Sequence, residues 1–172
     1  KIVSDYQIVS FNITSSEYKE IFDKNEYIRV DDKPKEDDVT SREFATALAL
    51  RKIFKKLKIE KSLSFHSSIK RAEKFEKLNV IVNDKLKNYP KVETFHVSSK
   101  QKTSTRNKEM RSFEKSKKSL MTNARCLTEG VDIPSIDCVA FIDPKKSKID
   151  IVQAAGRAMR VKKNKKFGYI LI

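Results

Sequence analysis

Several residue types are scarce in this 172-residue sequence, and each scarcity excludes a class of protein. The two cysteines, Cys126 and Cys138, fit neither a disulfide framework nor a CxxC metal site. No apolar run approaches the roughly 20 residues that cross a bilayer, and the first residues do not begin a secretion signal. We therefore expect a soluble, cytoplasmic protein with no membrane partner, in which both cysteines are reduced and structural.

The residues that are present favour a folded chain. Charged residues make up 35% of the sequence, a share that could indicate disorder, but ten Phe and five Tyr are interleaved with runs of Ile, Leu and Val. A chain of this length with 38% hydrophobic residues can bury the core of one domain.

Positive charge is concentrated in the second part of the chain. Residues 1–60 carry 12 basic and 12 acidic side chains, whereas residues 61–172 carry 26 basic and 11 acidic ones, so the net charge of +15 lies entirely after residue 60. A field of this size attracts polyanions. The charge is explained either by nucleic acid binding or by a merely soluble basic surface.

Helical and strand patterns alternate along the chain. Apolar spacing and capping residues predict helices over residues 40–57, 68–86, 103–114 and 147–159, the third capped by Thr103 or Ser104. Runs of β-forming residues predict strands over 6–13, 62–66, 92–97, 119–122, 138–142 and 169–172. This alternation indicates βαβ units, and so an α/β domain with a mainly parallel sheet covered on both faces, in which ligands bind at the carboxyl ends of the strands.

The last predicted helix carries one candidate site. Arg157 and Arg160 are three residues apart and share a helical face, and Gln153 lies one turn before Arg157. Planar guanidinium groups are suited to binding phosphates. Most arginine pairs with this spacing are simply solvated, so the pair alone is a weak indication.

A second candidate follows the strand predicted over residues 119–122. Residues 122–134 offer a hydroxyl, an amide and a carboxylate at the edge of the sheet, from Thr122, Asn123 and Asp132, together with Gly130. Each of these residues taken singly could be only a turn residue.

The two stretches together resemble a known family. Residues 120–134 are similar to motif V, and residues 153–160 to motif VI, of the form Q-x-x-G-R-x-x-R, of the second RecA-like domain of superfamily 2 helicases and translocases. The resemblance is to the branch with DEAD/DEAH-like proteins and the motor subunits of type I and type III restriction enzymes. Residues 62–68 resemble motif IV more weakly. The similarity covers residues 60–172 and implies a three-layer RecA-like fold.

The resemblance implies an ATP-dependent motor in which ATP lies between two RecA-like domains, with Mg²⁺ held mainly by the first. In that arrangement Arg160 is the arginine finger, Arg157 contacts the γ-phosphate and Gln153 couples the nucleotide to the other domain. Gly130 and Asp132 are expected near the nucleotide.

The same resemblance implies nucleic-acid contacts, carried by Thr122, Asn123, Ser67 and Arg106. Members of the restriction branch mostly act on double-stranded DNA, which makes DNA the expected partner. Lys-rich runs at residues 115–118, 145–148 and 162–166 are either further phosphate contacts or an ordinary basic surface.

Departures from the family pattern set the expected domain organisation. The sequence contains no G-x-x-x-x-G-K-[ST] loop and no acidic metal-binding box, so the chain alone is expected to be inactive. It also begins without Met. We expect residues 1–39 to be a connecting segment and linker from an absent N-terminal RecA-like domain, and residues 40–172 to be the second RecA-like helicase domain of a longer protein.

Two alternatives remain open at this stage. The domain could be a non-catalytic nucleic-acid-binding or scaffolding domain of the same fold, or it could move DNA for a restriction nuclease. Phe65 could stack on a base, although core packing explains it equally well. His66 and His96 have no ligand spacing, so we expect no metal site in this chain.

Overall fold

The computed structural model describes residues 5–9, 14, 16, 41–124, 136–143, 156 and 167–171. In chain order these residues form β1 (Asp5–Val9), α2 (Ser41–Lys56), β2 (Lys61–Phe65), α3 (Ile69–Lys85), β3 (Glu93–Ser98), α4 (Thr103–Lys115), β4 (Ser119–Ala124), β5 (Cys138–Phe141) and β6 (Phe167–Leu171). The strands build one sheet in the order β1-β6-β5-β2-β4-β3, and every pairing is parallel. The predicted α/β class with a parallel sheet is confirmed.

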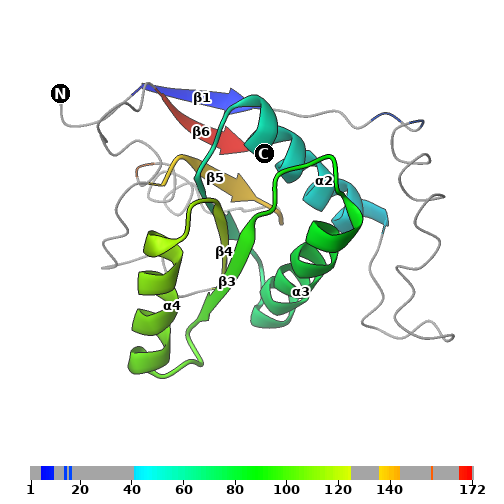
Figure 1. The fold of residues 1–172 in the computed structure, drawn as a ribbon. Helices are drawn as coiled ribbons and strands as arrows, with labels where there is room; N and C mark the ends of the chain where they lie inside the picture. The colour runs from blue at the N-terminus through cyan, green and yellow to red at the C-terminus, as the bar shows by residue number, and fades with distance from the viewer. Residues whose placement is uncertain are drawn as a thin grey trace, which may run out of the picture.

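The connections between strands explain the three layers. The chain moves outward from β2 through α3 to the edge strand β3, and then returns through α4 to β4. Right-handed crossovers that run in opposite directions place their helices on opposite faces of a sheet. Figure 1 shows this arrangement, with α3 on one side of β3 and β4 and α4 on the other.

The larger core lies between the sheet and the pair α2 and α3. Phe44, Leu48 and Phe54 of α2 pack with Phe75 and Leu78 of α3 and with apolar side chains from the sheet. Together with Leu50 and Ile53 they follow the three- and four-residue spacing of one helical face, which is why the sequence predicts both helices. Burying one such side chain fully stabilises the fold by about 1.5–3 kcal/mol.

A smaller core lies on the opposite face of the sheet. Phe113 of α4 packs with Met121 and Val97, while the neighbouring Leu120 contributes to the first core. Successive side chains of a strand point to opposite faces, so β4 serves both cores. Of the residues of α4, only Phe113 is fully buried, and the helix therefore presents most of its surface to solvent.

An arginine is buried between α2 and α3. Arg51 is 0% exposed, and one of its terminal nitrogens donates to the Asn79 carbonyl at 3.0 Å and to Asn83 Oδ1 at 3.1 Å. Its Nε and its other terminal nitrogen have no hydrogen-bond partner among the described residues, and burial lowers the pKa of Arg51 to about 10. The apolar pattern of α2 does not predict this residue inside the core.

Most predicted boundaries agree with the structure within a few residues, but the predicted cap of α4 is wrong. The N-cap residue is Lys102, and it makes no side-chain cap bond, whereas Ser68 caps α3 by accepting from the Arg71 amide at 3.2 Å. The helix predicted over residues 147–159 is described only at Gly156, which is helical. Strand β1 pairs with β6, and the domain boundary expected at residue 39 stays a prediction. Within the described residues, no helix combines the length and apolarity that crossing a bilayer requires.

Candidate functional site

The carboxyl ends of four neighbouring strands form one edge of the sheet. Parallel register sets Thr122 of β4 between Ser64 of β2 and His96 of β3, and it sets Phe65 opposite Phe141 of β5. The backbone continues this alignment past β2, because the His66 amide donates to the Asn123 carbonyl at 3.0 Å. The segments that follow β2 and β5 therefore meet at this edge, where ligands bind in open α/β sheets.

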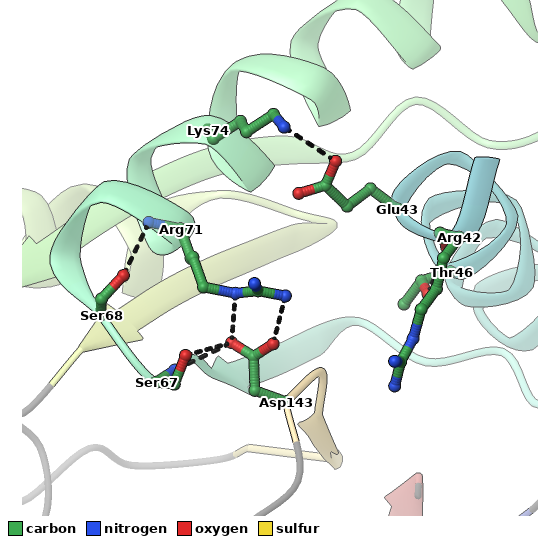
Figure 2. Close-up of polar contacts among 8 residues, drawn as sticks. All are labelled: Arg42, Glu43, Thr46, Ser67, Ser68, Arg71, Lys74 and Asp143. Carbon is green, nitrogen blue, oxygen red and sulfur yellow. Dashed lines mark hydrogen bonds and ion pairs between the residues drawn. The ribbon is translucent and has the colours of Figure 1, made fainter. Parts of the chain in front are cut away.

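Asp143 joins these two segments (Figure 2). Its Oδ2 accepts hydrogen bonds from the Ser67 amide at 2.9 Å, from Ser67 Oγ at 3.0 Å and from Arg71 Nε at 3.0 Å. Its Oδ1 lies 2.5 Å from a terminal nitrogen of Arg71. One carboxylate thus holds the turn after β2 and the first turn of α3 against the end of β5.

The charge of Asp143 is stabilised by these donors. Burial by itself raises the pKa of the carboxyl, but the hydrogen bonds from Ser67 and Arg71 and the charge of Arg71 outweigh it, and the net pKa is lowered. The Asp143 side chain is 7% exposed, whereas that of Arg71 is 50% exposed. The guanidinium is therefore fixed on one side and open to solvent on the other.

This fixed arginine is a candidate anion contact that the sequence reasoning missed. A guanidinium has five N–H donors, and Asp143 engages only some of them. The remaining donors of Arg71 can bind an anion at the edge of the sheet. The sequence contained a usable signal, since Arg71 lies in the stretch just after residues 62–68, but its partner is 72 residues away.

Two of the predicted nucleic-acid contacts lie beneath this edge. Thr122 and Asn123 are both 0% exposed. The Thr122 hydroxyl lies 2.9 Å from His96 Nδ1 and 3.4 Å from the Phe95 carbonyl, to which it donates. The His96 ring is nearly buried, and its Nε2 lies 3.8 Å from Glu73 Oε1. Burial lowers the pKa of His96, and the Glu73 charge opposes the shift in part.

The other two predicted contacts reach the surface. Ser67 is exposed, and its hydroxyl hydrogen is donated to Asp143. Arg106 is half-buried in the first turn of α4, a helix that begins soon after β3 ends and therefore starts at the same edge. The structure thus places all four predicted contacts along one edge of the sheet. Ser67 and Arg106 reach the surface there, whereas Thr122 and Asn123 are buried.

The aromatic and histidine side chains near this edge belong to the core. Phe65 is 2% exposed and stacks on Phe141 with ring centroids 5.7 Å apart, so core packing explains it. His66 is 5% exposed, lies 3.0 Å from Ser64 Oγ and packs against the ring of Phe75. Burial lowers the pKa of His66 to about 4, which keeps the ring neutral at pH 7.

The predicted nucleotide contacts lie outside the described residues, namely Gly130, Asp132, Gln153, Arg157 and Arg160. Gly156, in the same stretch as the arginines, is helical, and a Cβ placed on it would meet nothing within 4 Å. Over the described ranges, no group of three or more His, Cys, Asp or Glu side chains could hold a metal ion.

Comparison with known proteins identifies the family. Residues 45–162 match the family model described as "Helicase conserved C-terminal domain". This range contains the fixed Arg71, the edge residues and both candidate arginine positions. The chain is also 37% identical over 75 residues to "Putative helicase 22" of Sulfolobus islandicus filamentous virus, across 44% of this chain and 13% of that protein.

Solved structures share the fold. The ATP-dependent type ISP restriction-modification enzyme LlaBIII, solved bound to DNA, superposes with a TM-score of 0.74 at 22% identity, over 99% of this chain and 12% of that chain. Domain 2 of the DEAD-box helicase Mss116p, solved bound to an RNA duplex, gives a TM-score of 0.58 at 18% identity, over 76% of this chain and 48% of that chain. The chain thus spans about an eighth of the viral relative and of LlaBIII. With a family match over residues 45–162, most of its length, this chain belongs to the helicase conserved C-terminal domain family.

Proposed function

We propose that this chain is the second motor domain of an ATP-dependent nucleic-acid helicase or translocase. The observation that carries the proposal is the family match over residues 45–162, which includes the Q-x-x-G-R-x-x-R pattern of residues 153–160. The proposed partner is an N-terminal RecA-like domain of the same protein, and the ATP site is completed where the two domains meet. Both ATP and nucleic acid are intracellular, so we place this activity in the cytoplasm.

In this proposal the motif VI arginines act on ATP from across the domain boundary. Phosphoryl transfer depends mainly on positioning and on stabilising charge in the transition state, and an arginine finger contributes about 10³–10⁵ in rate. We assign this role to Arg160, the γ-phosphate contact to Arg157, and coupling to the partner domain to Gln153. Gly130 and Asp132 lie between these residues and β4 in the sequence and are assigned to the nucleotide side.

Mg²⁺ is assigned to the partner domain. Mg²⁺ requires oxygen ligands, and Arg157 and Arg160, the side chains proposed to meet the phosphates from this chain, offer none. The described residues hold no acidic cluster that fits the ion. This chain's part in the chemistry is then to supply positive charge and to close the site.

The nucleic-acid contact is proposed at the strand edge. Ser67, Arg71 and Arg106 reach the surface there, and Thr122 and Asn123 are buried along the same edge. The excess of basic residues after residue 60 supplies the long-range attraction. We favour double-stranded DNA as the substrate, supported by the neighbour solved with DNA, while the neighbour solved with RNA makes RNA the alternative to be tested.

The test is ATP hydrolysis by the intact protein that carries this domain, measured with no nucleic acid, with duplex DNA and with duplex RNA. We expect stimulation by DNA and loss of stimulated turnover by about 10³ or more in Arg160→Ala. The matched control is Arg42→Ala, which removes an exposed arginine of α2 and is expected to turn over like wild type.

Either of two results contradicts the proposal. Wild-type protein that hydrolyses no ATP with any nucleic acid would support the non-catalytic scaffolding alternative. An Arg160→Ala variant with normal turnover would remove the finger assignment.

A further inference from the structure

The outward face of α4 carries a basic groove that the proposed function does not use. Six exposed residues line a groove of about 440 Å³ along this helix, and we name them the α4 basic face: Ser104, Asn107, Lys108, Arg111, Ser112 and Lys115. They recur at three- and four-residue steps, so they share one side of the helix. The buried Phe113 anchors the other side to the sheet.

The three cations of this face are available to a ligand. Across the part of the chain that the structure describes, Lys108, Arg111 and Lys115 form no ion pair. Arg71 and Lys74 of α3, by contrast, are paired with Asp143 and Glu43. Unpaired cations gathered on one helix face repel one another, and this repulsion is relieved when an anion binds.

The acidic residues of α4 do not line the groove. Glu109 lies near Glu76 of α3, and burial together with the charge of Glu109 raises the pKa of Glu76. Ser104, Asn107 and Ser112, which can all donate hydrogen bonds, stand between the cations instead.

The dimensions of the face suit a phosphate backbone. A helix rises 1.5 Å per residue, so Lys108 and Lys115 are separated by about 10 Å along its axis. Duplex DNA carries one negative charge per about 1.7 Å of its axis, so several phosphates pass along this length. The face starts near the strand edge that holds Ser67 and Arg71, because α4 begins there, and it extends away from that edge (Figure 1).

We propose that the α4 basic face is a second binding site for the sugar-phosphate backbone of nucleic acid, separate from the strand edge. The inference rests on the proposed function only in taking nucleic acid as the ligand. Such a site binds without regard to base sequence, because its donors meet phosphates rather than base edges. It would hold the nucleic acid that extends beyond the strand edge.

The test is equilibrium binding of a fluorescein-labelled 20-base-pair duplex by the intact protein without nucleotide, over a range of salt concentrations. The variant is Lys108→Gln, Arg111→Gln, Lys115→Gln. The matched control is Lys77→Gln, Lys85→Gln, Lys87→Gln, which removes the same charge from exposed positions in and just after α3. Circular dichroism and thermal melting verify that both variants are folded.

We expect the α4 variant to bind more weakly and the slope of log affinity against log salt to become shallower by about 2.7, because three phosphate contacts are lost. The control should keep the wild-type slope within experimental error. A folded α4 variant with the wild-type slope would overturn the proposal, and so would equal losses in both variants, which would reflect net charge alone.

A second probe separates nucleic acid from acidic protein. Nucleic acid would be overturned as the ligand by the following result: labelled poly-L-glutamate binds the wild type more tightly than the duplex does, and its binding is lost only in the α4 variant. The binding test and the ATPase test can fail separately. Normal DNA-stimulated turnover, together with an unchanged salt slope in the α4 variant, would remove only this site and keep the motor. Altered slopes without ATPase activity would keep the site and remove the motor.

Discussion

Replacing Asp143 by asparagine tests the junction between the segments after β2 and β5. The substitution keeps the size of the side chain but removes its charge and one of its acceptor oxygens. Wild-type Asp143 accepts from the Ser67 amide, the Ser67 hydroxyl and Arg71 while its side chain is only 7% exposed. The carboxamide of the variant could not accept all of these bonds, and its N–H groups would face the donors of Arg71.

The size of the effect follows from burial. A hydrogen bond to a charged group contributes about 1.5–3 kcal/mol, but contributions within one network do not add. Arg71 is half exposed, so water can solvate its guanidinium once the partner is lost, which limits the Arg71 share to that of an exposed ion pair. We expect Asp143→Asn to lower the free energy of unfolding by about 2 kcal/mol at pH 7.

The effect of Asp143→Asn depends on pH in a defined direction. The folded state lowers the pKa of Asp143, so its contribution is fully present above the pKa of the unfolded carboxyl, about 3.9. The contribution is lost as the pH falls through the lower pKa of the folded state. The difference between wild type and variant should therefore be constant from about pH 5 to about pH 8 and shrink below about pH 4.

Urea unfolding followed by circular dichroism measures this difference. Asp84→Asn, at an exposed position in α3, is the matched control and should change the free energy of unfolding by less than about 0.5 kcal/mol. An Asp143→Asn variant as stable as this control, or one whose loss persists unchanged at about pH 2, would refute the reasoning.

Two further predictions concern buried titratable groups. His66 binds a proton near pH 6.5 in the unfolded state but only near its pKa of about 4 in the folded state. The free energy of unfolding should therefore be highest above pH 6.5 and fall by about 3 kcal/mol as the pH drops to 4. In urea unfolding of His66→Gln across this range, that fall should be absent. Arg51 is buried with unpaired nitrogens, so Arg51→Met should leave the free energy of unfolding within about 1 kcal/mol of wild type or raise it. Arg51→Ala should lower it by about 3 kcal/mol through the cavity left behind, and the same urea titrations check both variants.

The local elements could be predicted because their signals are local. The apolar spacing that buries Phe44, Leu48 and Phe54 is visible in the sequence, and the helix predicted from residue 68 begins next to its observed cap, Ser68. The cap of α4 was predicted wrongly because Thr103 and Ser104 are typical cap residues. In the structure the helix begins at Thr103, and Lys102 precedes it.

The long-range contacts of the site could not be predicted in the same way. Asp143 meets Arg71 only because β5 pairs with β2, and that neighbour relation comes from the sheet order rather than from sequence spacing. Sequence reasoning also expected Thr122 to reach a phosphate, while register places its hydroxyl against His96 in the interior. The parallel sheet that the family resemblance implied was confirmed, but the resemblance did not show how deeply each side chain is buried.

The placement of carboxylates divides the basic surface into two parts with different physical roles. At the strand edge, Asp143 pairs with Arg71 and fixes its orientation, which suits a contact that requires defined geometry. On the α4 basic face, no acidic residue of the described ranges lines the groove, so its cations are not held by a carboxylate there and can adopt many rotamers. Such a surface attracts a polyanion at long range and is weakened steeply by salt. The orientation of Arg71 at the strand edge should therefore change in Asp143→Asn and depend little on salt. Binding of a polyanion by the α4 basic face should depend on salt and change little in Asp143→Asn.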